Sequence, residues 1–365
     1  MKALLVIAAI TIGVVLMTSP QLTFTEEQRV WNKQQSKQWL NGRFHNTKTA
    51  EMSSLWEMTK GHFRQPNIDT NPDAAIPVES ISPVQLANLD PDESSLFRLG
   101  HSSILLHMNE QFILIDPVFS ERASPLSFLG PKRFHQPPIE MEALPYIDAL
   151  IISHNHYDHL DKASIKALRH KVGQFFVPLG LGQTLKKWGV ETNKITELDW
   201  WQSAYSKTIK LTATPAQHFS GRSITDRDKT LWASWSIEGS NKIFFSGDSG
   251  YFEGFKEIGE RLGPFDISLM ETGAYNELWQ GVHMMPEQSI QAHLDVRASY
   301  FLPIHNGTFK LSFHPWYDPF DQALSLSEQY NVNLLTPRIG QHVSVQQPKM
   351  QDRWWQALKN KPQDR

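Results

Sequence analysis

One short stretch restricts the fold of this chain more than any other, because it joins a buried strand to a cluster of metal-binding side chains. Residues 147–151 are apolar except for Asp148 and form a run typical of a buried strand. His154, His156, Asp158 and His159 follow on the loop that leaves it, and imidazole nitrogens and carboxylate oxygens are ligands that zinc accepts. The first two histidines can face one point while Asp158 and His159 face a second point nearby, which suggests two metal ions.

The alternative is a solvated polar loop that is merely rich in histidine. Such a loop has no reason to follow the strict His-x-His-x-Asp-His pattern of residues 154–159. The chain has no cysteine, so any metal must be held by His, Asp or Glu. The same absence excludes a disulfide framework and a cysteine-based redox site.

Length and charge narrow the class of protein further. The 365 residues are enough for one large or two ordinary domains with a sizeable core. The formal net charge is -3, and no basic stripe is present to neutralise phosphates along a nucleic acid. We therefore expect no nucleic-acid partner.

The N-terminus bears on the compartment. Residues 3–17 are almost entirely apolar after Met1-Lys2. As a helix they would reach only about 22 Å, against about 30 Å for a bilayer core, which suits a signal peptide better than a span. We assign residues 1–20 to a signal peptide or an uncleaved membrane anchor and expect an exported or inner-membrane-anchored protein on the periplasmic side. A buried helix in a cytoplasmic protein is the alternative.

The rest of the chain divides into segments that differ in amino-acid composition. Residues 21–93 are polar and proline-rich and are predicted to be an arm that packs on the main domain, residues 94–346 form that domain, and residues 347–365 form a polar tail or short helix. Two series of short strands within the main domain predict two sheets packed face to face with helices outside. The expected strands are residues 96–99, 103–107, 112–115, 149–153, 175–177, 207–214, 231–237, 242–246, 267–270 and 300–304, and the expected helices are 163–169, 253–262, 286–294 and 319–329.

Three further candidate ligands each follow a predicted strand. They are His218, Asp248 and His305. A lone histidine is more often structural than a ligand, but strand ends on one rim of a sandwich converge. Together with the histidine loop, these residues predict a single site at that rim.

The residue types and spacing resemble the metallo-β-lactamase superfamily. The resemblance implies an α+β, four-layer αβ/βα sandwich with two mixed sheets flanked by helices, and a two-zinc site along one edge. It implies one zinc ion on His154, His156 and His218, a second on Asp158, His159 and His305, and Asp248 as a bridge between them. Such metals lower the pKa of a shared water towards neutrality, so the nucleophile needs no separate base.

A narrower resemblance, over residues 94–345, is to the family of N-acylphosphatidylethanolamine-hydrolysing phospholipases D. It is carried by Asp116-Pro117-Val118-Phe119-Ser120, Gly130-Pro131-Lys132-Arg133-Phe134, Leu198-Asp199-Trp200-Trp201, Gly247-Asp248-Ser249-Gly250-Tyr251, Gly273-Ala274-Tyr275 and Ile304-His305-Asn306-Gly307. The family implies hydrolysis of a phospholipid phosphodiester to phosphatidate and an N-acylethanolamine, a membrane-facing groove and a homodimer. The chain departs from the family pattern in its apolar N-terminus and in Glu271, which stands where an apolar or small residue is expected.

Hydrolysis of a phosphodiester by a metal-bound hydroxide predicts roles for further residues around the metals. The leaving alkoxide would benefit from a proton or a metal. The candidate catalytic proton donors are Tyr157, which could instead pack under the loop, and His283, which could instead cap a helix. Asp116 and His101 are predicted to fix imidazole rings without touching metal. Most of the twelve tryptophans are expected to pack in the core or at its rim, but three near loops could instead contact acyl chains or a bilayer surface. These three are Trp200, Trp201 and Trp279.

Three functions remain open at this point. The first is a zinc phosphodiesterase acting on a phospholipid, with Asp158 and Asp248 in the catalytic centre. The second is a hydrolase of the same superfamily acting on an ester, lactone or amide, since the same nucleophile attacks carbon as readily as phosphorus. The third is a metal-loaded envelope protein that binds lipid without turnover.

Overall fold

The computed structural model describes residues 33–50, 68–350 and 352–359. The segment assigned to a signal peptide or anchor, residues 1–20, lies outside the described residues. Within them, no helix combines the length and the apolar character needed to cross a bilayer.

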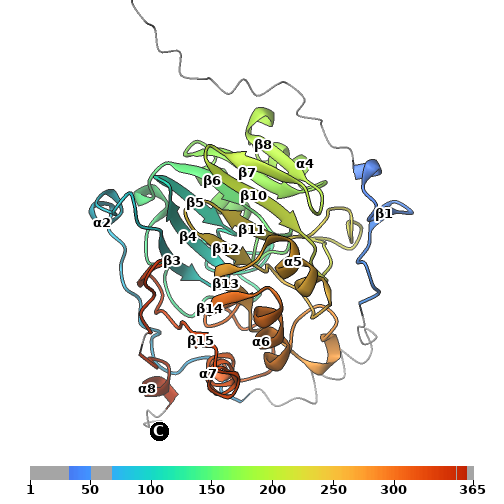
Figure 1. Ribbon diagram of the computed structural model, residues 1–365. Coiled ribbons are helices and arrows are strands. Elements are labelled where there is room, and N and C mark those ends of the chain that lie inside the picture. The colour runs from blue at the N-terminus through green and yellow to red at the C-terminus, as the bar shows by residue number, and fades with distance from the viewer. Residues whose placement is uncertain (1–32, 51–67, 351, 360–365) are drawn as a thin grey trace, which may run out of the picture. The chain divides into compact units, whose positions relative to one another are not determined.

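Two seven-stranded sheets organise the chain (Figure 1). The first has the order β16-β3-β4-β5-β6-β7-β8, and the second has the order β15-β14-β13-β12-β11-β10-β9. The strands of the first sheet are β3 Ser95–Gly100, β4 Ser103–Met108, β5 Gln111–Ile115, β6 Ile147–Ile151, β7 Val172–Pro178, β8 Ile195–Leu198 and β16 His342–Ser344. Those of the second are β9 Ser203–Ser206, β10 Ile209–Thr214, β11 Ser234–Glu238, β12 Lys242–Phe245, β13 Phe265–Glu271, β14 Ala298–Ile304 and β15 Asn333–Leu334.

Both sheets are mixed in the same way. From β16 to β5 neighbouring strands run antiparallel, and from β5 to β8 they run parallel. In the second sheet β9 to β12 are antiparallel and β12 to β15 are parallel. Parallel neighbours need crossover connections, which place helices on the outer face of each sheet.

The helices cover those outer faces. They are α2 Pro83–Ala87, α3 Lys162–Leu168, α4 Gly182–Lys187, α5 Gly254–Leu262, α6 Pro286–Asp295, α7 Asp318–Tyr330 and α8 Gln356–Lys359. Ile165 of α3 and Leu185 of α4 join the apolar cluster on the first sheet. Phe255 of α5, Ile290 of α6 and Leu326 of α7 join the cluster on the second, beside whose strands these helices lie in Figure 1.

The largest apolar cluster lies between the sheets and combines residues of both, such as Leu106 and Ile113 of the first and Leu211 and Trp235 of the second. Two facing sheets with helices on both outer faces are four layers. The predicted α+β sandwich is therefore confirmed, and α3, α5, α6 and α7 lie within one residue of their predicted bounds.

The short elements were not foreseen from the sequence. β9 and β15 are largely exposed edge strands, so they lack the alternating or fully apolar pattern of a central strand. α2 and α4 span five and six residues, less than two helical turns. Such elements are held by tertiary contacts rather than by their own periodicity.

Two segments outside the sheets also contribute to the core. A hairpin of β1 Trp39–Leu40 and β2 Arg43–Phe44 inserts Phe44, which is 1% exposed, into the cluster between the sheets. The amide N–H of Phe44 donates to the Asp228 carbonyl over 2.8 Å, which fixes the hairpin against the loop after β10.

Near the C-terminus, Trp354 and Trp355 are buried with Phe320 of α7.

One glycine shows how closely α5 and α6 approach. A Cβ atom added at Gly259 would lie 2.0 Å from the Asp295 carbonyl oxygen at the end of α6.

Gly259→Ala should lower the free energy of unfolding by about 1–3 kcal/mol, which is the range for overpacking. On an open helix face the same change would instead stabilise the protein by about 1 kcal/mol. Urea unfolding measures the difference. The control is Glu260→Ala on the exposed face of α5, and equal stability of both variants would contradict the close approach.

Candidate metal centre

The histidine loop is fixed at both ends. It leaves β6, where the Ile152 amide donates to the Phe176 carbonyl of β7 over 3.1 Å. It ends at Asp161, whose carboxylate accepts the amide N–H groups of Ala163 and Ser164 and so caps α3. The histidines therefore lie between a central strand and a capped helix, which holds their rings on one side.

Two groups of donor atoms form at this loop. Within each group the donor atoms lie within 4.8 Å of one another. One group is His154, His156, His218 and Asp248, and the other is His101, Asp158, His159 and His305. The structure thus brings together the seven residues predicted as ligands from the sequence, with His101 added to one group and Asp248 close to both.

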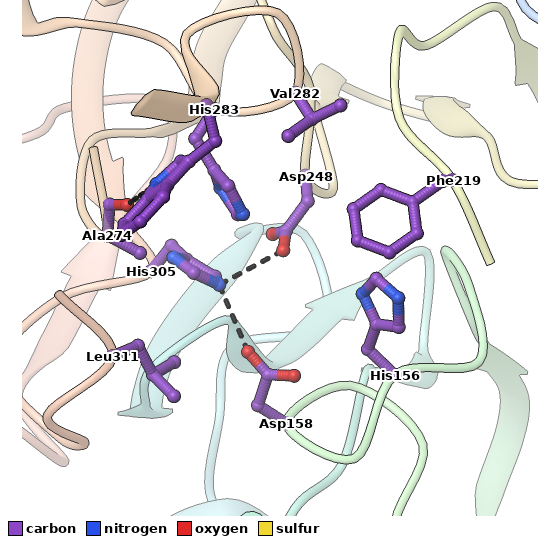
Figure 2. Close-up of a pocket in the computed structure, with 10 residues that line it drawn as sticks. His156, Asp158, Phe219, Asp248, Ala274, Val282, His283, His305 and Leu311 are labelled. Atoms are coloured by element: carbon purple, nitrogen blue, oxygen red, sulfur yellow. Dashed lines mark hydrogen bonds and ion pairs between the residues drawn. The ribbon is translucent and has the colours of Figure 1, made fainter. Parts of the chain in front are cut away.

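The distances place Asp248 between the groups (Figure 2). Its Oδ1 lies 3.0 Å from His159 Nε2, and its Oδ2 lies 3.1 Å from His305 Nε2 and 3.7 Å from His154 Nε2. Asp158 Oδ2 lies 3.2 Å from His305 Nε2. A carboxylate in this position can bridge two cations.

The residues fit metal ions on chemical grounds. His159 Nε2 and Asp248 Oδ1 are both buried and form no hydrogen bond with any described residue, although they lie 3.0 Å apart. Burying a polar atom without a hydrogen-bond partner destabilises the folded state. A cation would satisfy both, and a set of imidazole and carboxylate ligands without thiolate suits zinc and other borderline divalent ions.

Hydrogen bonds hold the rings in the required orientation. Asp116 is buried, accepts His159 Nδ1–H over 2.7 Å and accepts the Ser153 amide over 2.7 Å. His218 Nδ1–H donates to the Val282 carbonyl over 2.9 Å, which leaves Nε2 free for the centre. Asp116 therefore fixes an imidazole as predicted. His101 differs from the prediction, because its Nε2 contacts the Asp158 carboxylate at 3.0 Å and its own position makes it a further candidate ligand.

Burial and charge shift the titration of these groups. Burial lowers the pKa of His154 well below its usual value, and the neighbouring His159 adds to that shift. Burial also disfavours charge on His159, but Asp248 and Asp158 outweigh it and raise the pKa of His159 well above its usual value. Burial opposes ionisation of both carboxyls, yet His159 holds the pKa of each well below its usual range. The ionised carboxylates make the centre attractive to cations.

An asparagine of the N-terminal segment, unforeseen from the sequence, holds a ligand in place. Asn46 Nδ2 donates to the His218 carbonyl over 2.8 Å, and Asn46 Oδ1 accepts the His218 amide over 3.1 Å. Oδ1 also accepts Trp232 Nε1–H over 2.9 Å. No sequence signal connects residues so far apart, and Asn46 lies outside the stretches that carry the family resemblance.

The centre opens into a cavity of about 310 Å³. Its walls are mostly apolar. Besides the histidines and carboxylates, they include Phe219, Ala274, Val282 and Leu311, which are labelled in Figure 2. Trp279 also lines the cavity. An apolar wall above a polar floor fits a ligand with a charged group and hydrocarbon parts.

The three tryptophans singled out from the sequence have different positions. Trp279 lines the cavity and donates its Nε1–H to the Ala274 carbonyl over 2.7 Å. Trp201 is half-buried beneath the Arg261 guanidinium and lies at a different groove. Trp200 is only 6% exposed, packs between the sheets and donates to the Trp232 carbonyl. Trp200 therefore has the core role expected of most tryptophans and not the contact with acyl chains that its loop position also allowed.

The two candidate proton donors, Tyr157 and His283, lie in different surroundings. The Tyr157 hydroxyl donates to the Arg222 carbonyl over 3.0 Å, and the Arg222 guanidinium stacks on its ring at 3.8 Å. Tyr157 is not among the residues that line the cavity. This geometry corresponds to the packing role that was the alternative to proton donation.

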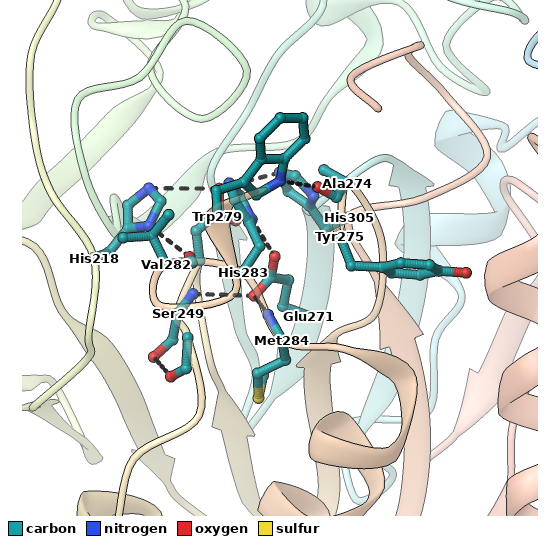
Figure 3. A network of polar contacts seen from close by, with 12 residues as sticks. His218, Ser249, Glu271, Ala274, Tyr275, Trp279, Val282, His283, Met284 and His305 are labelled. Atoms are coloured by element: carbon teal, nitrogen blue, oxygen red, sulfur yellow. Dashed lines mark hydrogen bonds and ion pairs between the residues drawn. The ribbon is translucent and has the colours of Figure 1, made fainter. Parts of the chain in front are cut away.

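His283 lies in the cavity wall, paired with a buried carboxylate. Its Nδ1 contacts Oε1 of Glu271, which is fully buried at the end of β13, while Glu271 Oε2 accepts the Ser249 amide over 3.1 Å (Figure 3). Residue 285, not 283, caps α6. Asp248, His283 and His305 form a third group of close donor atoms. The carboxylate that departs from the family pattern is thus the partner of the cavity histidine.

The fold and the site together define a class of protein. Residues 111–306 match the family described as "Beta-lactamase superfamily domain". The metallo hydrolase Igni18 of Ignicoccus hospitalis superposes with a TM-score of 0.53 at 20% identity, over 69% of this chain and 97% of its own. A possible metal-dependent hydrolase of Veillonella parvula superposes with a TM-score of 0.56 at 14% identity, over 69% and 99%. These define a hydrolase of the metallo-β-lactamase superfamily.

Relatives with higher identity specify the family. An uncharacterised protein of Mycobacterium tuberculosis is 40% identical over 339 residues, 88% of each chain. The N-acyl-phosphatidylethanolamine-hydrolyzing phospholipase D 1 of Caenorhabditis elegans is 38% identical over 272 residues, 70% of this chain and 75% of the relative. A mitochondrial enzyme of that description from Saccharomyces cerevisiae is 34% identical over 241 residues, 63% and 51%. The chain belongs to the N-acylphosphatidylethanolamine-hydrolysing phospholipase D family.

Asn46 provides a test of how the centre is held. Asn46→Ala leaves the His218 amide and carbonyl without these partners, so the zinc affinity should fall by about tenfold, the lower end of the effect of outer-shell changes. Competition with a chromogenic chelator measures the affinity. The control is His45→Ala at an exposed neighbouring position outside the donor groups, which should leave the affinity unchanged. Equal affinities for the two variants would show that Asn46 does not hold the ligand.

Proposed function

We propose that this protein is a binuclear zinc phosphodiesterase that hydrolyses N-acylphosphatidylethanolamine-like phospholipids to phosphatidate and an N-acylethanolamine. The observation that carries the proposal is the pair of donor groups sharing Asp248 at the floor of one apolar-walled cavity. Its relatives of that family at 38% and 34% identity support the choice of substrate. A phospholipid substrate also agrees with action at a membrane surface.

The donor groups account for the metal chemistry. His154, His156 and His218 would hold one ion, Asp158, His159 and His305 the other, and Asp248 both. Zinc ions bound there would lower the pKa of a water towards neutrality and offset the charge of the phosphate. The protein fixes these ligands by Asp116 and by the backbone contacts of His218.

The cavity residues orient the substrate and exclude water. Phe219, Trp279 and Leu311 form the apolar wall that would contact hydrocarbon next to the phosphodiester. His283 stands in the same wall, with Nδ1 held by Glu271, so its Nε2 would face the leaving alkoxide and supply the proton that it needs. The role of proton donor therefore falls to His283.

The reaction is tested directly with the full chain. Mass spectrometry should detect phosphatidate and N-acylethanolamine after incubation with N-acylphosphatidylethanolamine, a chelator should abolish their release, and added zinc should restore it. Asp248→Asn should reduce turnover by at least about a hundredfold, because one bridging charge is lost. Asp90→Asn, which changes an exposed carboxylate after α2, should leave turnover unchanged. Zinc-dependent opening of a lactone without phosphatidate release would instead favour the carbon-centred hydrolase.

Glu271 tests the role of His283. Glu271→Gln keeps the shape of the side chain but removes the charge that holds Nδ1–H, so kcat should fall by about tenfold or more. The zinc content and KM should stay unchanged, because Glu271 is not among the grouped donors. The measurement is steady-state kinetics with metal analysis of the same samples. A parallel loss of zinc would show that Glu271 supports the metal ligands instead.

A further inference from the structure

A hairpin outside both sheets is closed by its own backbone. Arg122 and Lys132 form an antiparallel bridge, the Ala123 amide donates to the Pro131 carbonyl over 3.0 Å, and the Arg122 guanidinium donates to the Gly130 carbonyl over 2.7 Å. Gly130 has φ 103°, and a Cβ atom there would lie 2.6 Å from Ser124 Cβ. The tip between these residues is therefore tightly closed, so its side chains point outward from a fixed base.

The tip exposes three large apolar side chains within four residues. Phe128 is 75% exposed, Leu129 62% and Leu126 43%. Single exposed apolar residues are ordinary, but a contiguous group marks an interaction surface. Lys132, which is also exposed and pairs with Glu121, adds a cation at the base of the same hairpin.

The hairpin is joined to the wall of the cavity. Arg133 and Phe309 form an antiparallel bridge, and the Phe134 amide donates to the Thr308 carbonyl over 2.8 Å. The segment so paired begins after the ligand His305 and continues to Leu311, whose side chain lines the cavity. The position of the tip is thus coupled to the wall beside the metal centre.

The size of the cavity indicates what the tip contacts. About 310 Å³ is at the lower end of the ~300–1,000 Å³ range of ligand pockets, enough for a phosphodiester and its neighbours but not for the long acyl chains of a phospholipid. Those chains must remain in an apolar medium at the mouth. A stable dimer interface buries about 800 Å² per partner from 20–30 residues, far more than three side chains provide, whereas a bilayer accepts a few anchors.

We propose that the tip formed by Leu126, Phe128 and Leu129 inserts into a phospholipid bilayer and holds the cavity mouth against it. The inference rests on the proposed function, since it takes the phospholipid as substrate. Lys132 at the base would then lie at the level of the phosphates.

The absence of cysteine makes the test specific. Full-length Phe128→Cys can be labelled at one position with a nitrobenzoxadiazole fluorophore, whose emission rises in an apolar medium. Vesicles of phosphatidylethanolamine and phosphatidylglycerol, without substrate, should raise the emission at position 128. The same label on Val84→Cys, 69% exposed on α2, should not respond. Phe128→Asp should lower turnover of vesicle-embedded substrate about tenfold or more and leave hydrolysis of water-soluble bis(p-nitrophenyl) phosphate unchanged.

The outcomes separate the two proposals. A vesicle-dependent rise at position 128 without phosphatidate release would support the membrane contact and reject the proposed substrate. Phosphatidate release with no rise at position 128, or with an equal rise at position 84, would overturn the membrane contact alone. A rise that depends on protein concentration and not on vesicles would show that the tip contacts a second copy of the chain, which also overturns it.

Discussion

His159 is the side chain on which the geometry of the centre depends. Its two ring nitrogens lie 2.7 Å from Asp116, 3.0 Å from Asp248 and 3.6 Å from Asp158, and the ring is fully buried. The carboxylates come from different places: after β5, after β12 and from the loop after β6. They can meet at one imidazole only if the facing sheets end at the same edge, so the packing of the sandwich and the site impose the same constraint.

The convergence of these side chains at one edge could be predicted from the sequence for a physical reason. A ligand that follows a strand is placed by that strand, and central strands carry strong apolar patterns that can be recognised locally. His218, Asp248 and His305 all follow strands of the second sheet, so their convergence with the histidine loop could be inferred before any contact was known. The predicted layers follow from the same patterns, because each central strand and each long helix buries an identifiable face.

The parts that could not be predicted depend on contacts between distant residues. Asn46 holds His218 through an amide that reaches both backbone atoms, and the polar sequence around residue 46 gives no sign of it. Trp200 lies in the loop between β8 and β9, as its sequence position suggested, but its indole is buried in the core. The departure at Glu271 was visible, but only the fold shows that it meets His283. In each case the local sequence shows which contacts a side chain is able to make, but only the tertiary structure shows which residue it contacts.

The same division bears on how substrates are chosen in this fold. The donor atoms are fixed by strand ends and by one another, so few of them can change without loss of the candidate metal site. The cavity walls, by contrast, come from loops: Phe219 after β10, Trp279 and His283 before α6, and Leu311 after β14. These loops can alter shape and proton transfer while the ligands stay in place. The carboxylate of Glu271, at the end of β13, contacts the cavity histidine His283 and is not itself among the grouped donors. Differences in substrate between related chains should therefore be sought in these cavity walls rather than in the ligand set.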